Sequence, residues 1–96
     1  MTRVEVGRTV FTFANTSEVY AAERALSTAG VSVGLRPVPH GVPSRCGLCL
    51  ELAVGDVDRA LSVLTRPVPE AIYVPGVVAG RWDRVGAPDS GIVPAV

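Results

Sequence analysis

Apolar and polar residues alternate along several short stretches of the chain, and each such stretch predicts a β-strand. Residues 9–14 (TVFTFA) combine β-branched and aromatic residues, and Phe11 and Phe13 are separated by one polar position. That spacing puts both rings on one face of a strand. Residues 31–36 alternate until a proline interrupts them, and residues 48–53 alternate leucine with other residues. Both stretches therefore predict half-buried strands.

Two other stretches repeat their apolar residues at the helical spacing. In residues 17–29 these side chains recur every three or four positions, the preceding residues 15–18 (NTSE) form a capping box, and Gly30 suits a left-handed C-cap. We expect a helix there. A second helix is predicted to start with Asp56 as its N-cap and to end before Pro67.

The order of these elements predicts a fold class. With a short fourth strand at residues 71–74, the order βαββαβ predicts an α+β, ferredoxin-like sandwich, which has a four-stranded antiparallel sheet and two helices on one face. We expect residues 1–8 to be an N-terminal lead-in and residues 9–75 to form the domain. Periodicity is lost over residues 76–96, which are expected to be a Pro/Gly-rich tail that folds back through Trp82.

Composition narrows the classes of function. The chain has 96 residues, 48% of them hydrophobic, and nine arginines balance nine acidic residues. Such a chain forms one small domain, and its zero net charge offers no footprint for nucleic acid or an anionic membrane. It has no lysine, which excludes Schiff-base chemistry on a lysine side chain. Since it also has neither a membrane-length apolar run nor a secretory signal pattern, we expect a cytoplasmic protein whose cysteines are thiols.

The chain has two cysteines, Cys46 and Cys49. They could be a redox pair, half of a metal site, or one working thiol with a bystander. If residues 48–52 form a strand, the two lie on opposite faces and roughly 10 Å apart, beyond the roughly 4.4–6.8 Å that a disulfide requires between Cα atoms. With His40 they supply three ligands, fewer than structural zinc needs. We therefore predict no metal site and no cofactor.

Cys46 stands out from Cys49 because of its neighbours. It lies between Arg45 and Gly47 at the end of a proline-rich loop, and no acidic residue occurs between positions 35 and 50. Cationic neighbours and uncovered amides favour a thiolate. In the predicted topology this loop also approaches residues 15–17 and the start of the first helix, whose dipole favours an anion. We expect an accessible, mildly acidic thiol.

The other candidate residues take supporting roles. Ser44 and the Gly47 amide could donate hydrogen bonds to an anion, Arg45 could steer an anionic partner, and His40 could shuttle a proton. Cys49 is expected to be a small buried residue, and the candidate second thiol if a redox pair exists. With Cys46 as the candidate catalytic residue, the supporting residues are Arg45, Gly47, Ser44, His40, Thr16 and Ser17.

The order of these features resembles the family of selenium/sulfur carrier-like proteins. The shared pattern is a strand, a Ser/Thr-started helix ending in Ala-Gly, a Pro-x-Pro segment, and a Ser-x-Cys-Gly turn before an apolar strand, and here it covers about residues 9–74. Cys49 departs from the pattern, because a small apolar residue is usual there. The pattern does not cover the tail beyond Gly76. Matching residues are Thr16, Ser17, Ala29, Gly30, Pro37, Pro39, Ser44, Cys46 and Gly47.

The resemblance implies that Cys46 accepts sulfur or selenium as a persulfide or selenosulfide and hands it on. It thus implies a carrier with a reactive cysteine, more than a stand-alone enzyme, and partners that donate and accept the chalcogen, such as a cysteine desulfurase. Two alternatives stay open from the residues themselves. One is a non-catalytic ferredoxin-like module that binds a ligand or forms a homodimer through its open sheet face. The other is a thiol–disulfide redox protein that uses Cys46 and Cys49.

Overall fold

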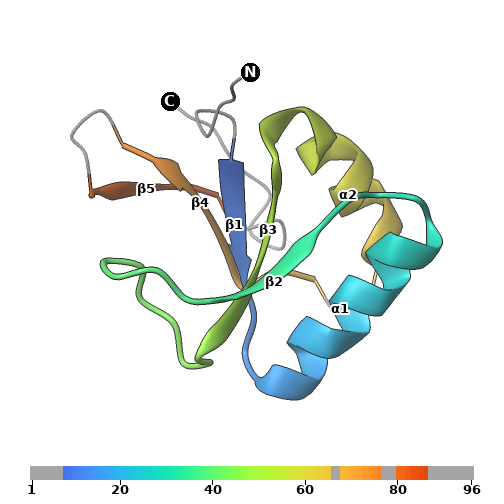
Figure 1. Cartoon of the computed structure of the whole chain (residues 1–96), viewed down its shortest axis with the longest axis horizontal. Coiled ribbons are helices and arrows are strands. Elements are labelled where there is room, and N and C mark those ends of the chain that lie inside the picture. Colours follow the sequence, from blue (N-terminus) through green and yellow to red (C-terminus); the bar gives the residue numbers. More distant parts are fainter. Residues whose placement is uncertain (1–7, 66–67, 77–79, 87–96) are drawn as a thin grey trace.

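The computed structural model describes residues 8–65, 68–76 and 80–86, which form one antiparallel sheet with helices packed on one side (Figure 1). The strands lie in the order β2-β3-β1-β4-β5. Within these residues, no helix is both long and apolar enough to pass through a membrane. The elements along the chain are β1 (Arg8–Thr12), α1 (Thr16–Thr28), β2 (Gly34–Pro37), β3 (Leu48–Ala53), a short 3-10 turn (Val54–Asp56), α2 (Val57–Val63), β4 (Ala71–Pro75) and β5 (Trp82–Gly86).

The α+β class and the element order βαββαβ are confirmed, but the expected number of four strands is wrong. Strand β5 adds a fifth, which lies within residues 76–96, the expected tail. It pairs antiparallel with β4, so that Trp82 lies opposite Pro75. This pairing covers an edge of β4 that would otherwise leave backbone groups free. The expected end of the second helix at Pro67 lies outside the described residues.

The predicted capping of α1 is confirmed at both ends. At the start, the Asn15 side chain accepts a hydrogen bond from the Glu18 amide at 3.0 Å, and Glu18 Oε1 accepts one from the Ala14 amide at 3.4 Å. At the end, Gly30 has φ of 83°. Two hydrogen bonds, from the Gly30 amide to the Ser27 carbonyl and from the Val31 amide to the Leu26 carbonyl, complete a Schellman motif.

This motif explains why β2 starts later than expected. The Val31 amide is engaged with the end of α1, and its side chain is buried beside Leu26 in the core. The residue therefore belongs to the helix cap, and the strand starts only at Gly34. Asp56 lies at the predicted N-cap position of α2, but its side chain does not act as a cap. The 3-10 turn that precedes α2 leaves Asp56 with helical backbone angles, φ −98° and ψ −1°, and its side chain makes no capping hydrogen bond.

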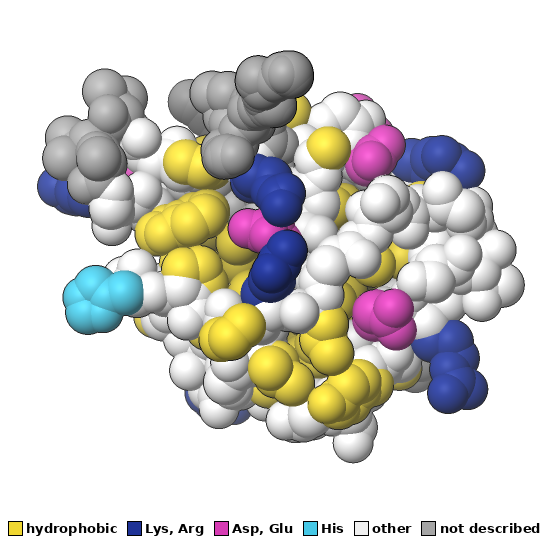
Figure 2. Space-filling model, viewed as in Figure 1, with side chains coloured by type: hydrophobic (Ala, Val, Ile, Leu, Met, Phe, Trp, Pro, Cys, Tyr) yellow, Lys and Arg dark blue, Asp and Glu magenta, His cyan; other side chains and the backbone are white. Residues whose placement is uncertain are grey.

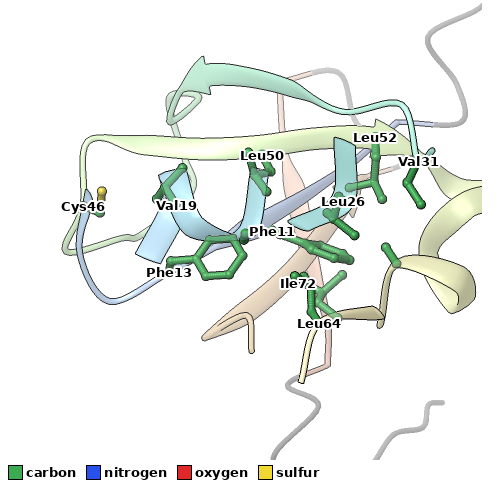
Figure 3. Close-up of a cluster of buried hydrophobic side chains, with 12 residues drawn as sticks. Phe11, Phe13, Val19, Leu26, Val31, Cys46, Leu50, Leu52, Leu64 and Ile72 are labelled. Atoms are coloured by element: carbon green, nitrogen blue, oxygen red, sulfur yellow. The ribbon is translucent and has the colours of Figure 1, made fainter. Parts of the chain in front are cut away.

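The main hydrophobic core lies between the sheet and the helices (Figure 3). The alternating side chains of β1 and β3 point into it, as the sequence predicts for Phe11, Phe13 and the β3 leucines. The buried members of this helix-side core are Phe11, Phe13, Val19, Ala22, Leu26, Val31, Cys46, Leu50, Leu52, Ala60, Leu64 and Ile72. A second cluster occupies the opposite, open face of the sheet. Its buried members are Val10, Val42, Cys49, Ala71 and Tyr73.

The cap at Gly30 yields a stability prediction. Alanine is strained at φ of 83°, whereas its Cβ would make only an ordinary contact, at 3.5 Å, with the Arg59 guanidinium. We expect Gly30→Ala to lower the free energy of unfolding by about 1–2 kcal/mol. The matched control is Gly55→Ala, because a Cβ there meets no atom within 4 Å and the backbone lies outside the left-handed region. Urea unfolding measures both variants, and equal losses would contradict the prediction.

Candidate functional site

The connection between β2 and β3, residues 38–47, lies over the open face of the sheet and ends on the helix side. Its base is closed by a 3.0 Å hydrogen bond from the Val38 amide to the Gly47 carbonyl. Midway, Val42 is buried in the cluster on the open face. A Cβ on Gly41 would lie 3.6 Å from the Gly80 carbonyl oxygen. The loop therefore extends from β2, at one edge of the sheet, to the residues that precede β5, at the other edge.

Cys46 lies near the end of this connection, on the opposite side of the sheet from Val42. It belongs to the helix-side core, at the end near Phe13 and Val19 (Figure 3), and only 6% of the residue is exposed. The expectation of an accessible thiol is therefore wrong for this conformation. The physical reason is that the sulfur fills the rim of the core where β1 and α1 meet, as a small hydrophobic side chain does.

Polar groups nevertheless surround the Cys46 sulfur. The Leu48 amide donates to Sγ at 3.4 Å, and Thr16 Oγ1 lies 3.5 Å from Sγ, with either atom able to donate. Thr16 is the first residue of α1, so the expected approach of the helix start to the cysteine is present. The Cys46 amide donates to Ser44 Oγ at 3.2 Å, which closes the turn. This arrangement suits a sulfur anion, because both neighbouring groups can donate to it.

Arg45 has an acidic partner that its neighbours in the sequence did not indicate. Its guanidinium forms an ion pair with Glu70, which precedes β4. The hydrogen bond to Glu70 and the charge of that carboxylate raise the pKa of Arg45, and Glu18 adds a smaller effect in the same direction. The loop is free of acidic residues in sequence, yet its arginine is paired in space. Glu70 was missed because it lies 25 residues further along the chain.

Cys49 is fully buried in the cluster on the open face, in agreement with the expected opposite-face position and small buried role. Its Sγ donates to the Pro37 carbonyl oxygen at 3.8 Å. Burial raises the pKa of the Cys49 thiol to about 11, with further contributions from the charges of Glu51 and Cys46, against a lowering by Arg36. Both cysteines are free thiols. Their separation by the sheet disfavours a disulfide between them.

The remaining candidates divide into two groups. Ser44 and Thr16 contact Cys46, and Gly47 is exposed with no atom within 4 Å of a Cβ built on it. His40 and Ser17 are also exposed, but in the described part of the chain no hydrogen bond joins either of them to Cys46. The functional roles of all these residues stay predictions.

The open face carries a second polar feature. Glu51 Oε1 pairs with Arg8 at 3.0 Å and with Arg36 at 3.3 Å, and Figure 2 shows basic side chains on either side of an acidic one next to an apolar surface. Beside this network is an open cavity of about 380 Å³, which Pro75 and Trp82 also line. Among residues 8–65, 68–76 and 80–86, no group of three or more His, Cys, Asp or Glu side chains could hold a metal ion.

Comparison with known proteins identifies the family. A family model described as "Putative Se/S carrier protein-like" matches residues 8–73, from the start of β1 into β4, and this match includes the whole Cys46 turn. Neither the curated proteins nor the solved structures give a match. Because the family model covers more than half of the chain, the protein belongs to the Se/S carrier protein-like family.

Proposed function

We propose that this protein carries sulfur or selenium on Cys46, as a persulfide or selenosulfide, and transfers it to an acceptor protein. The observation that carries the proposal is the setting of Cys46 Sγ, which lies at the start of α1 within hydrogen-bond distance of the Leu48 amide and the Thr16 hydroxyl. Family membership supports a carrier over an unrelated use of the same cysteine.

The chemistry is two successive displacements with no net oxidation. The Cys46 thiolate attacks the outer sulfur of a donor persulfide, a new S–S bond forms, and the donor leaves as a thiolate with the electron pair of the broken S–S bond. An acceptor thiolate then attacks the outer sulfur, a new S–S bond forms on the acceptor, and Cys46 leaves as a thiolate. The Leu48 amide and the Thr16 hydroxyl stabilise the sulfur anion in both steps by hydrogen bonding.

A carrier also requires that its chalcogen is not expelled by a neighbouring thiol. Cys49 cannot serve as that thiol, because it is buried on the other side of the sheet and its raised pKa keeps it protonated at neutral pH. The proposal therefore assigns one working thiol to the chain. Since free thiols stay reduced in the cytoplasm, that compartment would keep Cys46 available as the accepting nucleophile.

The direct test is sulfur loading. Incubation with a cysteine desulfurase and free cysteine should add one sulfur atom per chain, as measured by intact-protein mass spectrometry. Cys46→Ser should abolish the addition, because the accepting nucleophile is lost. Cys49→Ser is the matched control and should load like the unmodified protein. Loading that survives Cys46→Ser, or that needs Cys49, would refute the assignment.

Burial of Cys49 should slow its alkylation in the folded protein. In a Cys46→Ser variant, Cys49 is the remaining thiol and has a pKa of about 11 in the folded protein. A thiol with its pKa raised in this way stays protonated until alkaline pH. At pH 9 iodoacetamide should therefore modify Cys49 about fifty-fold more slowly in the folded chain than in urea, where its pKa returns to an ordinary value. Equal rates in the two states would show that the thiol is not protected by burial.

Thr16 provides a finer test of the proposed site. Thr16→Val removes the hydroxyl 3.5 Å from Sγ but keeps the shape of the side chain. We expect it to slow sulfur loading about five-fold, which corresponds to the loss of one hydrogen bond worth about 1 kcal/mol. Thr16→Ser should restore the rate, and Ser27→Ala, at the other end of α1, should leave it unchanged. A rate unaffected by Thr16→Val would remove the hydroxyl from the proposed chemistry.

A further inference from the structure

We propose that the ion pair between Arg45 and Glu70 is a latch that holds the Cys46 turn against the end of the sheet and limits access to the sulfur. The proposal rests on the proposed carrier function for its role, since a carrier must uncover its thiol for each transfer. Its physical content is narrower, because it concerns only how often Cys46 becomes accessible. That quantity can be measured without any sulfur donor.

The fixed side of the latch is Glu70. Its amide donates to the Thr12 carbonyl oxygen at 2.7 Å, at the end of β1, and the next residue, Ala71, pairs with Thr12 in the sheet. The carboxylate is thus carried by backbone that belongs to the sheet framework. About 35% of its side chain is exposed.

The moving side is the turn at residues 44–47. Arg45 directly precedes the buried Cys46, and its side chain is 75% exposed, so it can leave Glu70 without disturbing the core. The Cys46–Ser44 hydrogen bond is internal to the turn and does not tie it to the rest of the molecule. Among the described residues, the polar contacts that tie residues 44–46 to α1 and to the start of β4 are the Arg45–Glu70 pair and the contact between Thr16 and Cys46 Sγ. Packing of Cys46 in the helix-side core adds to them.

The latch is weak, as a reversible device must be. Exposed ion pairs contribute little and are screened by salt. We expect loss of the pair to raise the accessible fraction of Cys46 about two- to five-fold. The buried sulfur and its remaining contacts keep the closed form dominant.

The test measures the rate at which iodoacetamide, a neutral reagent, alkylates Cys46 in a Cys49→Ser background. Arg45→Gln is the decisive variant. Removal of a positive charge beside a thiol slows alkylation if the arginine acts only by favouring the thiolate. Removal of a latch speeds it. We expect a two- to five-fold increase for Arg45→Gln, a similar one for Glu70→Gln, and no additional increase for the double variant.

Two controls separate the latch from general electrostatics. Glu51→Gln removes a carboxylate that is also paired with arginine, but on the open face, and it should leave the rate unchanged. About 1 M NaCl should raise the rate in the Cys49→Ser background and add nothing in the Arg45→Gln variant. A slower or unchanged rate for Arg45→Gln would overturn the latch.

The outcome for the latch is distinct from the outcome for the carrier function. If Cys46 takes up sulfur from a desulfurase but its alkylation is indifferent to Arg45 and Glu70, the latch is wrong and the carrier function stands. If the variants accelerate alkylation while Cys46 takes up no sulfur, the latch stands and the carrier function is wrong.

Discussion

The arrangement depends on the register of β3 against its two neighbours. Leu50 pairs with Phe11 of β1 on one side and with Leu35 of β2 on the other. This register points every second side chain of β3, including that of its first residue, Leu48, to the helix side. The start of the strand lies beside the start of α1. The cysteine that precedes the strand is brought to Thr16 as a result. A shift of one residue would exchange the faces of both thiols.

Much of this fold could be predicted from periodicity, because the main strands and helices each bury one face against the same core. What local pattern could not predict came from contacts made elsewhere. Val31 follows the alternation of a strand although it completes the cap of α1. Strand β5 cannot be predicted from its pattern, because the five residues from Trp82 to Gly86 carry little alternation. Asp56 is the N-cap residue of α2 as predicted, but the preceding 3-10 turn gives it helical backbone angles and its side chain makes no capping hydrogen bond.

The same distinction applies to the site. Chain topology sufficed to bring Cys46 to Thr16, because in a βαββαβ arrangement the β2–β3 connection returns to the start of the first helix. Two properties of the site could not be predicted from the sequence, because they depend on the three-dimensional structure. The burial of Cys46 depends on how Phe13 and Val19 pack, and the pairing of Arg45 depends on Glu70, a residue with no sequence relation to the loop. A loop that has an arginine and no acidic residue in its own sequence forms a positive surface only when no acidic residue from elsewhere in the chain pairs with that arginine.

The placement of Cys46 and Cys49 on opposite faces has a kinetic consequence. A sulfur or selenium atom bound to Cys46 could not be removed by Cys49, because the five-stranded sheet separates the two cysteines. Its departure then needs a nucleophile from another molecule, and the rate is first order in that molecule. Under the proposed carrier function, the lifetime of the loaded protein would depend on the abundance of its recipients and on how often Cys46 becomes accessible, so the chain would keep its cargo until a recipient arrives.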